Sequence, residues 1–179
     1  MPQLDINVDD AYDFYLKYLL DPTNNKAELY TKYGFRFPGI PPSDWELFGA
    51  ILMRDRKNPR DTGADLLRHE VKSAGMRSSF EYQYHKYHGL DKLRDEANVD
   101  HLFFSYGDNY QNLDARLVDT RLLGPIFESW LPLLEKNYDL DGRQRFRKSV
   151  PYGFVVKNGL LLLSIRDGKL IYAIGKDGS

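Results

Sequence analysis

Two carboxylates and one amine lie close together in residues 63–74, among apolar residues that are typical of a strand: Asp65, Glu70 and Lys72. Alternate residues of a strand point to the same face of a sheet, so Glu70 and Lys72 share one face and Val71 points to the other. Oxygen atoms are the ligands that Mg²⁺ prefers, and the pattern therefore predicts a metal site formed by Asp65, Glu70 and the Val71 carbonyl. Lys72 is then expected beside the water or the phosphate of a hydrolytic reaction.

The spacing of the two carboxylates sets a condition on the backbone. Asp65 and Glu70 would point to opposite faces of a straight strand, so they can share a metal only if the chain bends sharply around Leu67-Arg68-His69. The alternative first ligand is Asp61. We favour Asp65, because its neighbours are typical of the beginning of a strand. The structural alternative to a metal site is an exposed strand that carries a Glu/Lys pair.

Asp65 followed by Glu70-Val71-Lys72 resembles the PD-(D/E)xK signature of many type II restriction endonucleases and DNA-repair nucleases. The residue before Asp65 is alanine rather than proline. The resemblance implies an α/β fold with a restriction-endonuclease-like core, in which helices flank a central mixed sheet. It also implies Mg²⁺ as the cofactor, with Mn²⁺ as a substitute, and phosphodiester hydrolysis in which Lys72 positions or deprotonates the attacking water.

Length and composition limit the protein class. The chain has 179 residues, enough for one domain with a substantial core, and its 28% charged residues are typical of a globular protein. It contains no cysteine, which excludes disulfides, a thiolate nucleophile and a cysteine-ligated zinc. No apolar run is long enough to span a membrane, and the first residues do not resemble a signal peptide, so we expect a cytoplasmic protein of bacterial or archaeal origin. The net charge of −1 argues against a uniformly basic coat for nucleic acid.

Three helices are predicted before the motif. The first is capped by Asp9 or Asp10 and ends at Asp21-Pro22, and the second runs from Asn25 to Tyr33 and ends at Gly34. The third begins with Ser43-Asp44-Trp45-Glu46, which has the form of a capping box.

Glu46 has two interpretations. It can return a hydrogen bond to the Ser43 backbone as part of the cap. Alternatively, several branches of the nuclease superfamily place a helix glutamate before the core, aimed at the metal. Glu46 matches that position and is a further candidate catalytic residue that could bind a second ion.

A helix from Phe80 to Ala97 and a buried strand from Asp100 to Tyr106 are predicted after the motif. The order helix, strand, strand, helix, strand agrees with the core that the resemblance implies. Gln83 and Tyr87 would share a face of the helix and are similar to the Q-x-x-x-Y element of exonuclease-like branches. Candidate DNA contacts in this region are Arg77, Ser78, Ser79, Gln83, Tyr84, His85 and Lys86.

A second basic segment follows a predicted strand at 115–119 and a helix that is opened by Gly124-Pro125 and kinked at Pro132. Its candidate DNA contacts are Arg143, Arg145, Arg147 and Lys148. In an extended chain the three arginines share one face, which suits a DNA groove, where arginine reads guanine edges or phosphates. The alternative is an edge strand whose cations discourage aggregation.

The C-terminal region predicts a β-meander over residues 152–174, with strands at 154–156, 160–165 and 169–174. Asn158-Gly159 and Asp167-Gly168 have the chemistry of tight hairpin turns.

These features together predict a single nuclease domain over residues 1–179. It comprises an N-terminal helical segment (1–42), a catalytic core (43–135), and a basic segment with a β-meander (140–179) for DNA recognition or dimerisation. We expect a Mg²⁺-dependent type II restriction endonuclease that cuts double-stranded DNA as a homodimer, because one active site cuts one strand. The alternatives are a repair or structure-specific nuclease of the same superfamily and, outside enzymes, a non-catalytic DNA-binding subunit.

Overall fold

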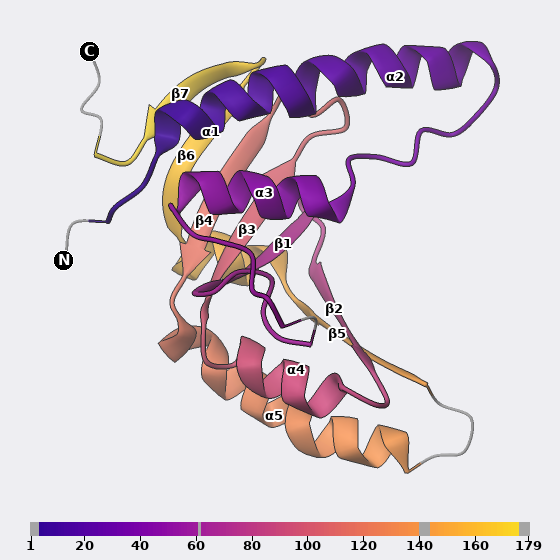
Figure 1. Cartoon of the computed structure of the whole chain (residues 1–179), viewed down its shortest axis with the longest axis vertical. Coiled ribbons are helices and arrows are strands. Elements are labelled where there is room, and N and C mark those ends of the chain that lie inside the picture. The colour runs from indigo at the N-terminus through magenta and orange to yellow at the C-terminus, as the bar shows by residue number, and fades with distance from the viewer. Residues whose placement is uncertain (1–3, 61, 140–143, 176–179) are drawn as a thin grey trace.

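The computed structural model describes residues 4–60, 62–139 and 144–175, and within them a five-stranded sheet forms the centre of the fold (Figure 1). Its strands, in spatial order, are β1 (His69–Gly75), β3 (Asp100–Tyr106), β4 (Leu113–Val118), β6 (Leu160–Arg166) and β7 (Lys169–Ala173). β1 runs parallel to β3, and the other neighbours are antiparallel. The predicted α/β class with a mixed central sheet flanked by helices is confirmed.

Helices cover both faces of this sheet (Figure 1). The described helices are α1 (Val8–Phe14), a π-helical segment (Tyr15–Leu20), α2 (Asp21–Lys32), α3 (Pro42–Leu52), α4 (Gly89–Glu96), α5 (Thr120–Tyr138) and α6 (Tyr152–Asn158), of which α2 extends beyond the sheet (Figure 1). Residues alternate between the two faces along each strand, so the core divides into two clusters. Leu102 and Phe104 of β3 pack on the side of α1 and α3, whereas Phe103 packs on the side of α4 and α5.

The N-terminal helices are continuous where the sequence predicts a break. Asp21-Pro22 lies where the π-helical segment Tyr15–Leu20 passes directly into α2, so the proline does not end the helix there. Asn7, rather than Asp9 or Asp10, caps α1 by accepting a hydrogen bond from the Asp10 N–H. The predicted end at Gly34 is confirmed, since this glycine follows α2 with a φ of +75° that a side chain would disfavour.

The helix predicted from Phe80 to Ala97 is only partly correct, because only its last part is helical. The chain instead forms a strand, β2 (Phe80–His85), followed by a turn and by α4. Its aromatic residues alternate with polar ones, and this spacing of two buries Phe80, Tyr82 and Tyr84 on one side of a strand. Gln83 and Tyr87 therefore share no helix face, and Tyr87 lies 81% exposed in the turn.

The basic segment forms a strand of its own, β5 (Arg145–Val150), which pairs antiparallel with β2 to make a two-stranded ribbon. The predicted three-stranded meander is only partly correct. Residues 152–158 form α6, which follows Pro151, and the predicted turn at Asn158-Gly159 is the end of that helix. The hairpin turn at Asp167-Gly168 is confirmed, with φ values of +51° and +74°.

The last predicted helix also begins earlier than the sequence suggests. Asp119 caps α5 by accepting a hydrogen bond from the Arg121 N–H, so Pro125 lies inside the helix rather than at its start. None of the helices that the structure describes is both long enough and apolar enough to cross a bilayer.

Candidate active site

The chain bends sharply between Asp65 and Glu70, as the spacing of these residues requires. The Leu66 N–H donates to the His69 carbonyl at 2.9 Å and closes the bend. The Asp65 N–H donates to Glu70 Oε2 at 2.9 Å, and the Val71 N–H donates to Asp65 Oδ2 at 3.2 Å. The two carboxylates are therefore held against one turn of backbone, and the predicted bend is confirmed.

Lys72 lies on the same face of β1 as Glu70 and contacts its carboxylate directly through Nζ. The same Nζ lies 3.9 Å from Asp65 Oδ2 and 3.9 Å from Glu96 Oε1. Burial opposes the charge of Lys72, but the Glu70, Glu96 and Asp65 carboxylates outweigh it and raise the pKa of the lysine. Lys72 is thus a cation among carboxylates.

The two predicted ligands differ in their environment. Burial raises the pKa of Asp65 to about 6; Lys72 lowers it, while Glu70 and Glu46 raise it. Burial also opposes ionisation of Glu70, which has no exposed surface, but Lys72 prevails and lowers the pKa of this carboxyl. Burial is therefore the main reason that the Asp65 carboxyl keeps its proton to a higher pH than an exposed aspartate does.

A polar network that the sequence analysis missed lies behind Lys72. The Tyr84 hydroxyl donates to Glu96 Oε2 at 2.5 Å, while Glu96 Oε1 accepts no hydrogen bond from a described residue and lies 3.5 Å from Lys92 Nζ. Burial and the Glu70 charge raise the pKa of Glu96 well above its usual range. In the sequence Glu96 looks like a solvated helix residue, and only the Lys92–Glu96 spacing of four pointed to a pair.

Tyr84 was predicted to contact DNA; that prediction is wrong, because its ring is fully buried.

A pocket of about 310 Å³ opens beside these groups at β1, the edge strand of the sheet. It is lined by Pro42, Trp45, Glu46, Asp65, Val71, Lys72, Ser73 and Glu81. The Val71 N–H points to the open edge of β1, where it donates to Asp65. In a strand the carbonyl of a residue points to the same edge as its N–H, so the Val71 carbonyl points to this edge too. Asp65, Lys72 and the Val71 main chain therefore all border one accessible hollow.

Glu46 reaches this pocket from α3. The predicted capping box is wrong, because α3 begins at Pro42 without a side-chain cap. Glu46 Oε2 instead accepts a hydrogen bond from Lys57 Nζ at 2.8 Å. Its carboxylate lines the same hollow as Asp65, as the second interpretation of Glu46 requires.

The donor chemistry of the site suits a hard divalent cation. Within the described residues, no three side chains of His, Cys, Asp or Glu gather closely enough to hold a metal ion. The predicted set needs only Asp65 and Glu70 with the Val71 carbonyl, and oxygen donors of this kind are those Mg²⁺ uses, together with water. The alternative ligand, Asp61, lies outside the described residues.

The predicted DNA contacts fall on different surfaces. Gln83, His85, Arg145 and Arg147 lie on the outward side of the β2/β5 ribbon, and Lys86 is exposed in the turn that follows β2. Lys148 lies on the opposite side, with its Nζ 5.6 Å from the centre of the Phe146 ring. Exposed residues between β1 and β2 are Arg77, Ser78 and Ser79. Arg143 lies outside the described residues.

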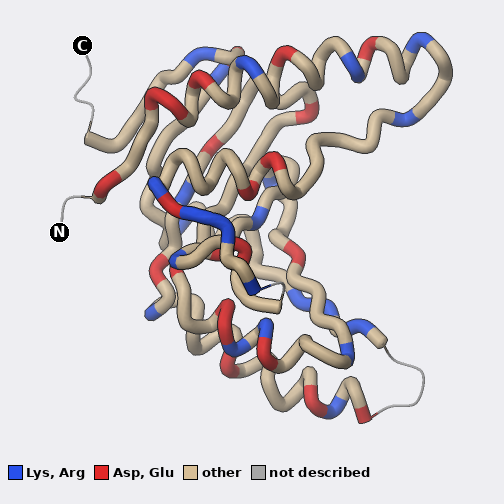
Figure 2. Tube along the Cα trace, viewed as in Figure 1, with Lys and Arg blue, Asp and Glu red and all other residues tan. Residues whose placement is uncertain are grey.

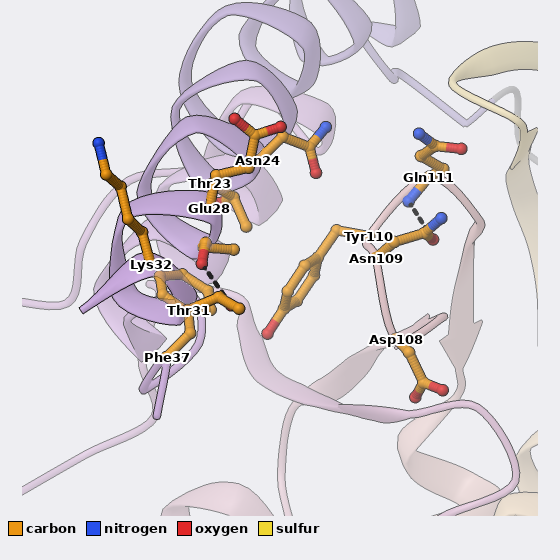
Figure 3. Close-up of a pocket in the computed structure, with 11 residues that line it drawn as sticks. Thr23, Asn24, Glu28, Thr31, Lys32, Phe37, Asp108, Asn109, Tyr110 and Gln111 are labelled. Atoms are coloured by element: carbon orange, nitrogen blue, oxygen red, sulfur yellow. Dashed lines mark hydrogen bonds between the residues drawn. The ribbon is translucent and has the colours of Figure 1, made fainter. Parts of the chain in front are cut away.

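A larger hollow, of about 730 Å³, lies elsewhere, between α2 and the loop that joins β3 to β4 (Figure 3). Tyr110 points from this loop toward the helix, and Asn109 and Gln111 lie beside it (Figure 3). The charged side chains of this hollow, Glu28, Lys32 and Asp108, are exposed rather than buried against one another. The smaller pocket is the better candidate site, because its ionised groups are desolvated and in mutual contact.

A scan against protein-family models finds no match for the chain, and a search of curated proteins finds no relative.

Proposed function

We propose that the protein is a Mg²⁺-dependent, sequence-specific endonuclease for double-stranded DNA, of the type II restriction kind and with a restriction-endonuclease-like core. The observation that carries the proposal is the convergence of Asp65, Glu70 and Lys72 at the edge of the sheet, where Asp65 and Lys72 line a pocket and Glu70 lies buried against both. An edge strand leaves room for a bulky polymer, since none of the described strands pairs with that side of β1. The helix–strand order around the motif also agrees with the resemblance.

Each group has a role that its position supports. Asp65, Glu70 and the Val71 carbonyl would hold the ion, which would supply Lewis acidity and lower the pKa of a bound water. Lys72 remains protonated beside the carboxylates, which favours a positioning role over that of a general base. Its ammonium orients the attacking water and offsets negative charge that develops at the scissile phosphate. Glu46, which lines the same pocket, would bind a second ion.

Two copies are required for a double-strand cut, because one site hydrolyses one strand. The proposed active form is therefore a homodimer bound to duplex DNA. A repair or structure-specific nuclease with the same core uses the same three groups, and a non-catalytic DNA-binding subunit would use none of them for cleavage. The choice of substrate separates these alternatives.

The test is cleavage of plasmid DNA by alanine variants at Asp65, Glu70 and Lys72 in Mg²⁺ and in Mn²⁺. Each variant should lose cleavage while binding duplex DNA in Ca²⁺, and Glu28→Ala, which removes an exposed carboxylate in the other hollow, should cut normally. If all three variants still cut, the site is wrong. Mismatched and branched substrates belong in the same assay, because a restriction enzyme cuts intact duplex at short sites whereas a structure-specific nuclease does not.

A further inference from the structure

The β2/β5 ribbon begins beside the candidate active site and extends to the start of α4 and the end of α5 (Figure 1). Six residue pairs, from Phe80 with Val150 to His85 with Arg145, hold it together. Its inward residues fill the core against α5. Its outward residues form what we call the ribbon face: Glu81, Gln83, His85, Arg145, Arg147 and Ser149.

The ribbon face is continuous with the active-site pocket through Glu81, which lines that pocket together with Asp65 and Lys72. Gln83 and His85 follow Glu81 on the same side of β2. A strand rises by about 3.4 Å per residue, which places them about 7 and about 14 Å further along. Stacked base pairs are also spaced by about 3.4 Å, so this row covers about four base pairs beside a phosphate held at the site.

Gln83 and Arg147 face each other across the ribbon and are joined edge to edge. Arg147 Nε donates to Gln83 Oε1 at 3.0 Å, and Gln83 Nε2 lies 3.3 Å from His85 Nε2. The Arg147 side chain is 56% exposed, which leaves its outer guanidinium edge accessible. A guanidinium reads the O6 and N7 atoms of guanine, and a glutamine amide reads the N6 and N7 atoms of adenine.

Charge and shape on the ribbon suit a duplex. Lys and Arg residues gather along it (Figure 2), and they include Arg145 and Arg147 on the ribbon face and Lys86 at its end. Glu81 Oε1 lies 3.9 Å from Arg147 Nε, so an acidic side chain holds the arginine in place without neutralising the whole face. A two-stranded ribbon fits the major groove, which is about 12 Å wide.

We propose that the ribbon face enters the major groove of double-stranded DNA and that Gln83 and Arg147 set the base preference of the protein. Their mutual hydrogen bond holds both planar groups in one orientation before DNA arrives, which lowers the entropy cost of binding. The inference rests on the proposed function in one respect, namely that duplex DNA is the ligand.

The experiment is selection of bound duplexes from a random-sequence library in Ca²⁺, so that preference is measured without cleavage. The wild-type chain should select a short motif. Gln83→Ala and Arg147→Ala should each lose about 10- to 100-fold discrimination at separate positions of that motif. Arg147→Lys keeps the charge but not the planar fork, so it should retain affinity and lose the preference. Arg36→Ala, which removes an exposed arginine in the α2–α3 loop, should leave the motif unchanged.

The outcomes separate the two proposals. If the variants select the same motif as the wild type, or if the wild type binds duplex without preference or prefers single strands, the ribbon face does not read bases. A wild-type chain that cuts DNA at sites unaltered in the variants likewise overturns the reading role and leaves the nuclease proposal standing. If the motif shifts as expected but no cleavage occurs in Mg²⁺ or Mn²⁺, the reading role is supported and the nuclease proposal fails.

Discussion

Lys72 contacts Glu70, two residues before it on β1, and the glutamate has no exposed surface. Removing a carboxylate and an ammonium from water costs several kcal/mol each, about as much as their attraction returns. Apolar side chains would avoid that cost here, and one at position 72 would lie near Tyr82, whose ring centre is 4.8 Å from Lys72 Nζ. The pair is therefore poorly explained by stability alone, which is the physical reason for interpreting it as part of a functional site.

Replacing Lys72 alone should lower the stability of the fold more than replacing both Glu70 and Lys72. Lys72→Met leaves Glu70 buried without its cation, and it should lower the free energy of unfolding by about 3–5 kcal/mol. The double variant Glu70→Leu/Lys72→Met should recover a large part of that loss, because the uncompensated charge is gone. Urea unfolding of the two single variants and the double variant measures the coupling. Strictly additive effects would contradict direct pairing, and Lys26→Met on the exposed side of α2 serves as the control.

Asp55 stabilises the loop before the site through hydrogen bonds, and its carboxylate is almost completely buried. It accepts hydrogen bonds from His69 Nδ1 at 2.7 Å and from the Arg68 N–H at 3.0 Å. Asp55→Ala should cost about 2–4 kcal/mol, since a buried histidine and two backbone donors lose their acceptor. The variant Asp5→Ala, which removes an exposed ion pair with Arg54 in the same region, should cost less than about 1 kcal/mol.

The Asp55 effect should also depend on pH. Burial favours the neutral acid, but His69 and the backbone donors of Arg56 and Arg68 prevail, so the pKa of Asp55 lies below 3.8 in the folded chain. Its contribution is then complete above 3.8 and is lost as the pH falls through the lower, folded value. The difference in free energy of unfolding between the wild type and Asp55→Ala should therefore shrink as the pH falls below 3.8. A difference that does not change with pH would show that the carboxylate is not stabilised by folding.

The site was predictable where the argument depended on parity along the chain. Glu70 and Lys72 had to share a face, and Asp65 could join them only through a bend, whatever the tertiary contacts. Glu96 and Tyr84 were not predictable in the same way. They meet because β2 and α4 pack against each other, and no local spacing in the sequence encodes that contact.

The errors in the fold have a similar cause. Residues 80–88 carry aromatic groups at spacings that fit both a helix and a strand, and pairing with the distant β5 decides for the strand. Residues 154–156 are β-branched or aromatic and look like a strand, yet Pro151 and the packing of Val155 make them a helix. In both segments, tertiary contacts outweigh local preference.

Close packing between α3 and β1 positions Glu46 over the pocket. A Cβ at Gly49 would lie 3.1 Å from Val71 Cγ2 and 3.3 Å from Leu102 Cδ1. Gly49→Ala should therefore destabilise the fold by about 1–3 kcal/mol despite the better helix propensity of alanine. Gly153→Ala, in α6 with open space around its Cα, should be neutral or stabilising by up to about 1 kcal/mol. Thermal unfolding of both variants tests the contact, and an equal or smaller loss for Gly49→Ala would contradict it.

His101, opposite Glu70 on β3, should make stability fall as the solution becomes acidic. Its Nδ1 lies 2.7 Å from the Tyr82 hydroxyl and its Nε2 lies 2.8 Å from the Glu96 carbonyl, which together indicate a neutral ring with the proton on Nε2. Burial lowers the pKa of His101 to about 4 from 6.5. Because the unfolded chain binds this proton more readily, the contribution of the ring is complete above 6.5 and is lost as the pH falls toward 4.

The expected effect is about 2 kcal/mol between about pH 7 and about pH 5. Urea unfolding at both pH values gives the loss of unfolding free energy on acidification, and this loss should be larger in the wild type than in His101→Gln. The exposed histidine at position 88 provides the control, and His88→Gln should lose as much unfolding free energy on acidification as the wild type. If His101→Gln and the wild type lose stability equally on acidification, the ring is not held neutral by burial, and the polar network behind Lys72 carries charge that these contacts do not account for.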